Sequence, residues 1–210
     1  MEIHAPLHPI MSLREFLVHL SMVTLGILIA LGLEQSVEAY HHRELAREAR
    51  ENIRSEIRDN KKDLDKHLGD LDGLRKERKD DLVVIEKMLG HEKLKEASMS
   101  INFYGATLSS ASWSTASTVG ALVYMDYAEV KQLAEAYKKQ EFYDQLQNEQ
   151  IKMVQVGLGL MSSIGESKPT DDELRAVRSQ LLQSHASLVV LDQLGRQLDA
   201  EYDKVLGNSK

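Results

Sequence analysis

Glu38 and His41 have a spacing that places a carboxylate and an imidazole on one face of a helix, and His42 follows four residues after Glu38. Helical bundles use pairs of Glu-x-x-His motifs, with two further carboxylates, to hold two iron or manganese ions. The chain contains only one such motif, so a metal site here would need a second copy of the chain. A polar patch at the lipid headgroups is the interpretation we favour, and we predict no metal or other cofactor.

Trp113 lies in the second stretch with chemical potential, residues 101–120, where Ser, Thr, Ala and Gly dominate. Its indole offers a large contact surface, and Ser109, Ser110 and Thr115 offer hydroxyl groups for hydrogen bonds. This combination predicts a possible ligand groove. The alternative is a closely packed internal helix with Trp113 in the core, and a helix over this stretch would align Ala106, Ser109, Trp113, Ala116 and Gly120.

Known catalytic motifs are missing from the sequence. It has no Gly-x-Ser-x-Gly elbow for a serine nucleophile, and no P-loop, dinucleotide fingerprint, zinc-protease motif or EF-hand loop. Cysteine is also missing, which excludes disulfides and thiolate chemistry. We therefore predict that the chain is not an enzyme.

Phe16 to Leu33 is a run of about 18 residues without a charged side chain, close to the length that crosses a lipid bilayer as a helix. Backbone groups in lipid must pair within the segment, which requires a helix there. A cleaved secretory signal and a buried helix of a soluble core are the two alternatives. The run is long for a signal and passes into an amphipathic pattern without turn residues. We therefore favour a retained anchor.

Gly26 and Ala30 place two small residues on one face of this predicted membrane helix. Small residues at this spacing let helices approach closely in lipid, so they predict a contact with a second copy or another membrane protein. The basic residues on either side of the run bear on its orientation in the membrane. Applied literally, the positive-inside rule places the bulk of the chain in the cytoplasm, because only one basic residue precedes the run and four follow it closely: Arg14, then Arg43, Arg47, Arg50 and Arg54.

Composition favours an all-α protein. Gly numbers 12, Pro 3 and aromatic residues make up 5%, while Glu, Lys, Arg, Ala and Leu are abundant after the apolar run. The net charge of −7 argues against nucleic acid as a partner. We predict a tail over 1–12, a transmembrane helix over 13–33, a water-soluble antiparallel bundle of about four long helices over 34–206, and a tail over 207–210.

Local signals define the ends of these helices. Apolar residues recur at helical spacing from Leu45 to Leu89, but Gly69 and Gly73 leave a hairpin and one continuous helix equally open. The mixed charges on these helices also suggest a coiled coil, although such charges more often mark a helix face that is exposed to solvent. Helix starts are predicted at the capping boxes Ser12 with Glu15 and Thr170 with Glu173, and at the N-cap Asp126. Helix stops are predicted at Gly90 and Gly207.

Three stretches together resemble a family of uncharacterised bacterial single-span membrane proteins. They are the membrane exit GILIAL at 26–31, the charged helix with NIRSEI at 52–57, and the later segment with Trp113 and GAL at 120–122. Members of that family have a GVLIAL-type exit followed by a helical domain. The resemblance implies a single-pass protein of the bacterial inner membrane, and it implies no activity or site residue.

These observations predict a membrane-anchored helical interaction or scaffold protein that self-associates, with the lipid bilayer and a second copy or another membrane protein as partners. The alternative is a single-span sensory bundle that binds a small molecule near Trp113 and acts through a partner. A metal-dependent enzyme using Glu38, His41 and His42 at the membrane surface is the least favoured of the three.

Overall fold

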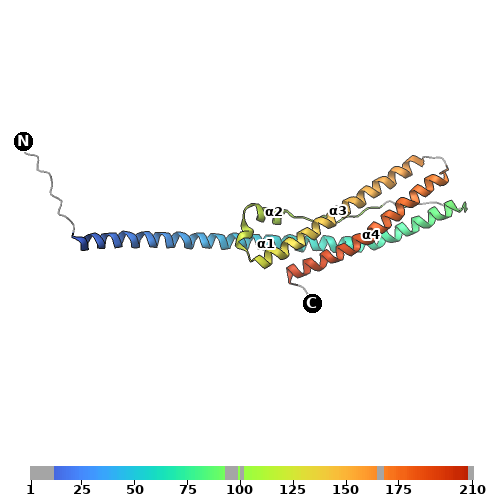
Figure 1. Cartoon of the computed structure of the whole chain (residues 1–210). Coiled ribbons are helices and arrows are strands. Elements are labelled where there is room, and N and C mark those ends of the chain that lie inside the picture. Colours follow the sequence, from blue (N-terminus) through green and yellow to red (C-terminus); the bar gives the residue numbers. More distant parts are fainter. Residues whose placement is uncertain (1–11, 93–98, 100–101, 165–167, 208–210) are drawn as a thin grey trace, which may run out of the picture. The chain divides into compact units, whose positions relative to one another are not determined.

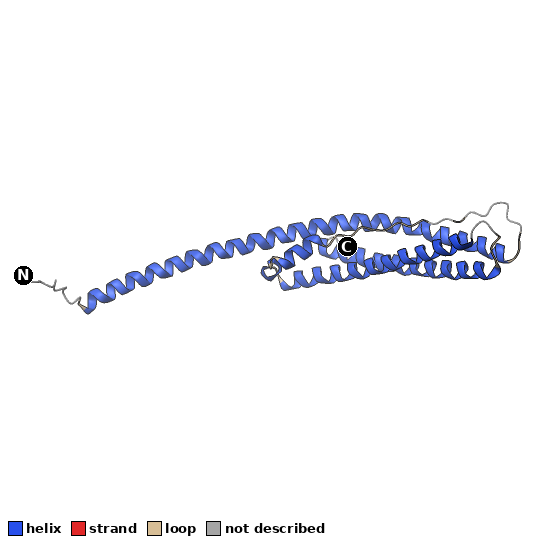
Figure 2. Cartoon of the chain, turned by 90° about the horizontal axis from the view of Figure 1, so that it is seen from above, coloured by secondary structure: helices blue, strands red, loops and turns tan. Residues whose placement is uncertain are grey.

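The computed structural model describes residues 12–92, 99, 102–164 and 168–207, and these contain helices and no strand (Figures 1 and 2). The all-α prediction is therefore confirmed. The chain divides into two compact units, Met1–Arg47 and Glu48–Lys210. The helices are α1 (Leu13–Leu89), α2 (Ala111–Thr118), the 3-10 helix η1 (Ala121–Tyr124), α3 (Tyr127–Ile164) and α4 (Asp171–Leu206).

Helix α1 begins where its capping box predicts. The backbone N–H of Ser12 donates to the Glu15 carboxylate at 3.0 Å, and the N–H of Glu15 donates to the Ser12 hydroxyl at 3.3 Å. The helix then continues without a break through Gly69 and Gly73, which answers the question that the sequence left open. A side chain would have free space at either glycine.

Helix α1 ends at Leu89, which confirms the predicted stop at Gly90. The residue with the left-handed backbone conformation is His91, however, and not the glycine. His91 adopts φ 56°, and the N–H of Glu92 donates to the carbonyl of Lys87 at 3.0 Å. The N–H of His91 donates to the carbonyl of Met88, also at 3.0 Å. Together these bonds form a Schellman motif that satisfies the last carbonyls of α1.

The first unit is helical from Leu13 and contains the apolar run. Its most apolar window has a mean hydropathy of 2.3, and none of that window is buried within the structure. Two of its few polar side chains bond inside the helix, because the hydroxyls of Ser21 and Thr24 donate to carbonyls at 2.9 and 2.8 Å. By length and composition this is the one helix in the described part of the chain that is able to cross a membrane.

In the second unit, α1 and α3 run in the same direction. Three side-chain hydrogen bonds join them, from Arg50 to Glu129, Asn60 to Gln140 and Tyr137 to Glu56, and their sequence separations stay nearly constant at 79, 80 and 81 residues. A constant separation is possible only for parallel helices. This differs from the antiparallel order expected for neighbouring helices joined by short loops.

The parallel order arises because the described residues between α1 and α3 form no long helix. The helix expected over 101–120 is confined to the eight residues of α2, and the residues from 102 to 110 that the structure describes are not helical. The chain therefore returns along the bundle before α3 begins. Asp126 caps α3 as predicted, accepting hydrogen bonds from the N–H groups of Ala128 and Glu129 at 2.8 and 3.2 Å.

Helix α4 is antiparallel to α1 and α3. Its partners on α1 move backwards along the chain, from Lys61 with Asp199 to Arg75 with Asp192 and Glu86 with Arg178. The predicted capping box of Thr170 and Glu173 is present, and Gly207 closes the helix at φ 78°. Three long helices therefore form the bundle, with α2 and η1 packed beside them.

The bundle core follows the apolar stripes of these helices. The large apolar and aromatic side chains that are fully buried come from all three long helices: Ile53, Ile57, Leu64, Leu71, Ile85, Tyr143, Leu188, Leu191, Leu198 and Tyr202. Helix α4 approaches α1 and α3 closely at Gly195. A β-carbon there would lie 2.6 Å from a methyl group of Leu68 and 3.0 Å from the ring of Tyr143.

Candidate ligand-binding groove

Two amide side chains hold the extended segment before α2 against the bundle. Gln147 of α3 accepts a hydrogen bond from the N–H of Ala106 and donates to its carbonyl, both at 2.9 Å. Asn60 of α1 does the same for Ser109, accepting from its N–H at 2.8 Å and donating to its carbonyl at 2.7 Å. Each amide thus satisfies both backbone groups of one residue, as a neighbouring strand does.

Glu56 of α1 caps the start of α2 from outside that helix. The hydroxyl of the preceding residue, Ser110, makes no capping hydrogen bond. Instead, the carboxylate of Glu56 accepts hydrogen bonds from the N–H of Ser112 and the hydroxyl of Ser109, both at 2.8 Å. The hydroxyl of Tyr137 donates to its second oxygen at 2.6 Å. A negative charge at a helix N-terminus is also favoured by the helix dipole.

These contacts determine the protonation of Glu56. Burial alone would raise the pKa of this carboxyl, but hydrogen bonds from Ser112, Tyr137, Ser109 and the backbone of Trp113 outweigh burial and lower it. Burial and the bond to Glu56 raise the pKa of Tyr137. The carboxylate is therefore ionised and the phenol neutral at physiological pH.

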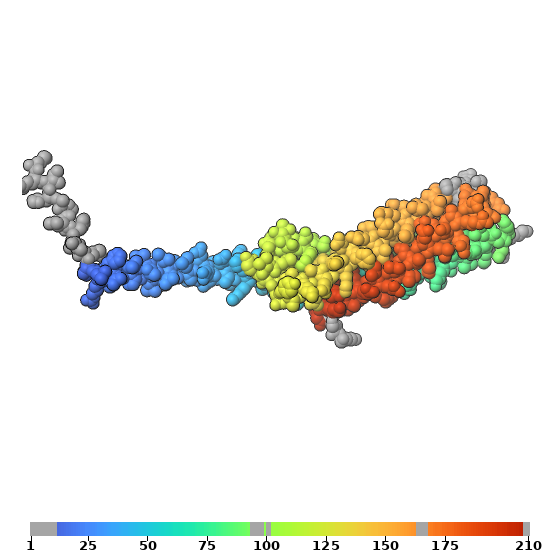
Figure 3. Space-filling view, viewed as in Figure 1, coloured from blue at the N-terminus to red at the C-terminus, as the bar shows by residue number. Residues whose placement is uncertain are grey.

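Trp113 stacks on Tyr137 at the wall of a surface groove. The ring centroids lie 5.2 Å apart and the planes are 17° from parallel. The groove has a volume of about 510 Å³, within the range of small-molecule sites. Figure 3 shows the segment that contains α2, in yellow-green, packed against the start of α3. The groove is lined by Ser110, Trp113, Ala134, Tyr137, Lys138, Gln140, Glu141 and Asp144.

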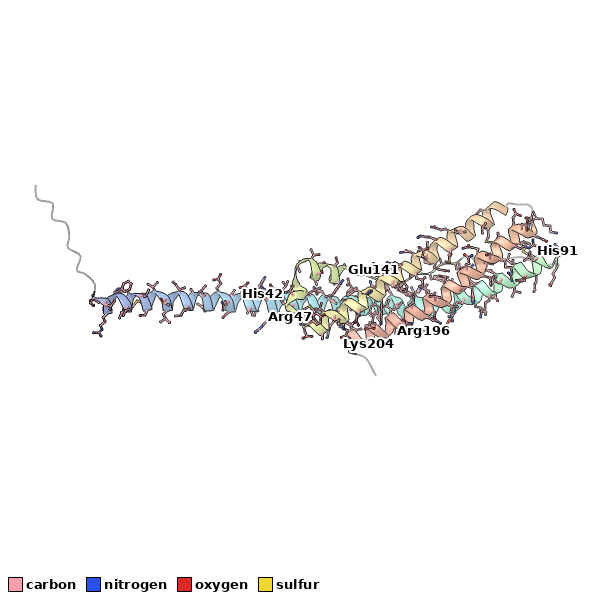
Figure 4. The ribbon with its side chains drawn as sticks, in the orientation of Figure 1. His42, Arg47, His91, Glu141, Arg196 and Lys204 are labelled. Atoms are coloured by element: carbon pink, nitrogen blue, oxygen red, sulfur yellow. The ribbon has the colours of Figure 1, made fainter. Side chains whose placement is uncertain are left out.

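Two carboxylates of α3 border the aromatic pair. Glu141, labelled in Figure 4, is exposed, and Asp144 is partly buried. Burial raises the pKa of Asp144 to about 6. A carboxyl with a raised pKa at a groove is a common feature of functional sites.

Of the four residues predicted for this groove, two line it and two do not. Trp113 and Ser110 line it. Ser109 does not, because its hydroxyl is bound to Glu56 and its backbone to Asn60. Thr115 is exposed on α2 and also lies outside the lining.

Sequence reasoning missed the contribution of α3 to the groove. Tyr137, Glu141 and Asp144 occur at positions i, i+4 and i+7 of one helix, so they share a face, and that spacing was visible in the sequence. Nothing in the sequence showed that this face meets Trp113.

The other predicted site residues belong to the first unit. Gly26 and Ala30 are exposed, and a β-carbon at Gly26 would meet no atom within 4 Å. His42 lies 3.8 Å from the Glu38 carboxylate, and His41 is exposed. Among the residues that the structure describes, no three His, Asp or Glu side chains gather closely enough to hold a metal ion.

Comparisons of the chain with protein-family models, with curated proteins and with solved structures returned no match.

Proposed function

We propose that this chain is a membrane-anchored helical interaction protein that self-associates in the bilayer. The observation that carries the proposal is the uncharged helical run Phe16–Leu33, no part of which is buried within the structure. Such a surface is unfavourable in water, at about 25 cal/mol for each Å² of apolar area. A lipid bilayer is the environment in which it is stable.

Self-association is supported by the small-residue face of Gly26 and Ala30. Small side chains let two helices approach in lipid, where packing rather than the hydrophobic effect joins them. The acidic bundle that follows would then interact with its partners from a fixed place at the membrane.

Cysteine cross-linking in native membranes tests this proposal, because the chain has no cysteine of its own. Ala30→Cys lies on the small-residue face, and Leu28→Cys lies on the opposite face as the matched control. We expect oxidation to give a disulfide-linked dimer with Ala30→Cys and little with Leu28→Cys. Equal cross-linking at both positions, or none at either, would contradict self-association through this face.

A second candidate function is favoured by the groove beside Trp113: a bundle that binds a small ligand and signals through a partner. The groove combines an aromatic pair with ionisable side chains, as ligand sites commonly do. A ligand screen by thermal shift tests it. We expect a ligand that raises the melting temperature of the wild type and has no effect on Trp113→Ala; a screen without such a ligand counts against this function.

A further inference from the structure

We infer that the groove beside Trp113 binds a small organic cation, such as a quaternary or primary ammonium group. This inference rests on the second candidate function, ligand binding at the same groove, and adds the chemical class of the ligand. Three features of the lining support it: an aromatic surface, an excess of carboxylates and the small number of competing cations.

The aromatic surface comes from Trp113. One face of its indole lies against Tyr137, and the side chain is partly exposed and lines the groove. The π face of tryptophan carries negative charge density and attracts cations more strongly than other aromatic side chains do. Tyr137 is buried and fixed by its bond to Glu56, so it holds the indole in place.

The carboxylates come from one face of α3. Glu141 and Asp144 lie one and two turns beyond Tyr137, and both line the groove. Burial raises the pKa of Asp144 to about 6, so the fold keeps this carboxylate at a cost to its own stability. A bound cation would offset that cost, whereas an anion would increase it.

Among the described residues that line the groove, Lys138 is the one basic side chain, and it is exposed. Long lysine side chains extend their charge into water and leave their methylene groups on the protein surface. The neighbouring Lys139 is paired with Glu201 on α4 and does not line this groove. Two carboxylates therefore face one ammonium group, and the groove favours positively charged ligands.

Fluorescence of the full-length protein in detergent provides a direct test, because Trp113 is the single tryptophan of the chain. The probes are choline, tetramethylammonium and dimethylbutanol, the uncharged isostere of choline in which a tert-butyl group replaces the trimethylammonium. We expect a saturable fluorescence change with both cations, and binding of dimethylbutanol that is weaker by roughly 5-fold or more.

Substitutions of the two carboxylates then locate the site while leaving the fluorophore in place. We expect Glu141→Gln and Asp144→Asn each to weaken choline binding by several fold. Glu149→Gln is the matched control, since Glu149 is exposed on α3, pairs with Lys152 and lies outside the groove. It should leave choline binding unchanged.

Three results would overturn the inference: no saturable change with either cation, equal binding of dimethylbutanol and choline, or equal weakening by Glu149→Gln and the groove variants. Equal binding of the neutral isostere would contradict the cation class while still supporting a ligand groove, so the two failures are distinguishable. The cross-linking experiment on the membrane helix is independent of both.

Discussion

Tyr137 of α3 donates a hydrogen bond of 2.6 Å to Glu56 of α1, and the two residues are 81 positions apart in the chain. The same carboxylate caps α2, so one buried side chain joins three helices. Its hydrogen bonds help to stabilise this short, Ser-rich helix, since isolated helices of this length are unstable in water.

Glu56→Ala should therefore destabilise the bundle markedly. The change leaves the Tyr137 hydroxyl buried without its acceptor and the start of α2 uncapped, and we expect a loss of about 3 kcal/mol in the free energy of unfolding. Urea denaturation followed by circular dichroism measures this loss. Glu149→Ala, which removes an exposed carboxylate of α3, should change stability by less than about 0.5 kcal/mol. A similar small effect at Glu56 would show that the cap is unimportant.

Glycine-to-alanine substitutions should act in opposite directions at two sites. At Gly195 the new methyl would lie 2.6 Å from Leu68, so we expect a loss of about 1–3 kcal/mol from overpacking. At Gly69 the methyl has free space in a continuous helix, so we expect a gain of about 1 kcal/mol. Urea midpoints of the two variants give the comparison. A stabilised Gly195→Ala protein would refute the close approach of α4.

Acid should weaken the bundle through His67. This side chain is 2% exposed, neither ring nitrogen has a hydrogen-bond partner among the residues that the structure describes, and its ring lies nearly perpendicular to the ring of Tyr143. Burial lowers the pKa of His67, although the nearby Asp70 acts in the opposite direction. The unfolded chain therefore binds a proton at this histidine more readily than the folded chain does. The free energy of unfolding has its full value above about pH 6.5 and decreases as the pH falls below it.

The variant His67→Leu tests this origin of acid sensitivity. It removes two unpartnered buried nitrogens, so we expect a gain of about 1 kcal/mol at neutral pH and a flatter stability profile between about pH 7 and pH 5. His41→Gln, at an exposed histidine, should leave the profile as in the wild type. An unchanged profile in His67→Leu would mean that other groups cause the acid sensitivity.

Asp144→Asn should stabilise the protein at neutral pH. The pKa of Asp144 is raised to about 6 by burial, so the folded state holds its proton more tightly than the unfolded state. Stability therefore declines as the pH rises from about 4 to 6 and stays lower above that. We expect the neutral amide to raise the free energy of unfolding by about 1 kcal/mol at pH 7.5, discounted for partial exposure. No gain, or a loss, would show that the ionised carboxylate is well solvated.

Local chemistry made the helix ends predictable. Ser12 with Glu15, Asp126, and Thr170 with Glu173 each act within three residues, and the structure contains all of these caps. The continuity of α1 was not predictable in the same way. A glycine destabilises a helix by about 1 kcal/mol relative to alanine. Burial of the flanking Leu68, Leu71 and Leu74 stabilises this part of α1 by more than that cost.

The direction of α3 and the make-up of the groove depend on contacts between distant residues. Asn60 and Gln147 bind the backbone of Ser109 and Ala106, and this fixes the extended return of the chain. No periodic pattern marks an amide that will bind a distant backbone. The sequence therefore indicated Trp113 as a site residue without indicating that Tyr137 and Asp144 would share its groove.

We propose that Phe16–Leu33 remains embedded in lipid in the mature protein. The most direct test of this proposal is to wash membranes that contain the full-length chain with alkaline carbonate, then measure the intact mass of the protein that is retained. We expect the protein to stay in the membrane fraction with its first residues present. Release into the wash, or a mass that lacks the apolar run, would contradict the account.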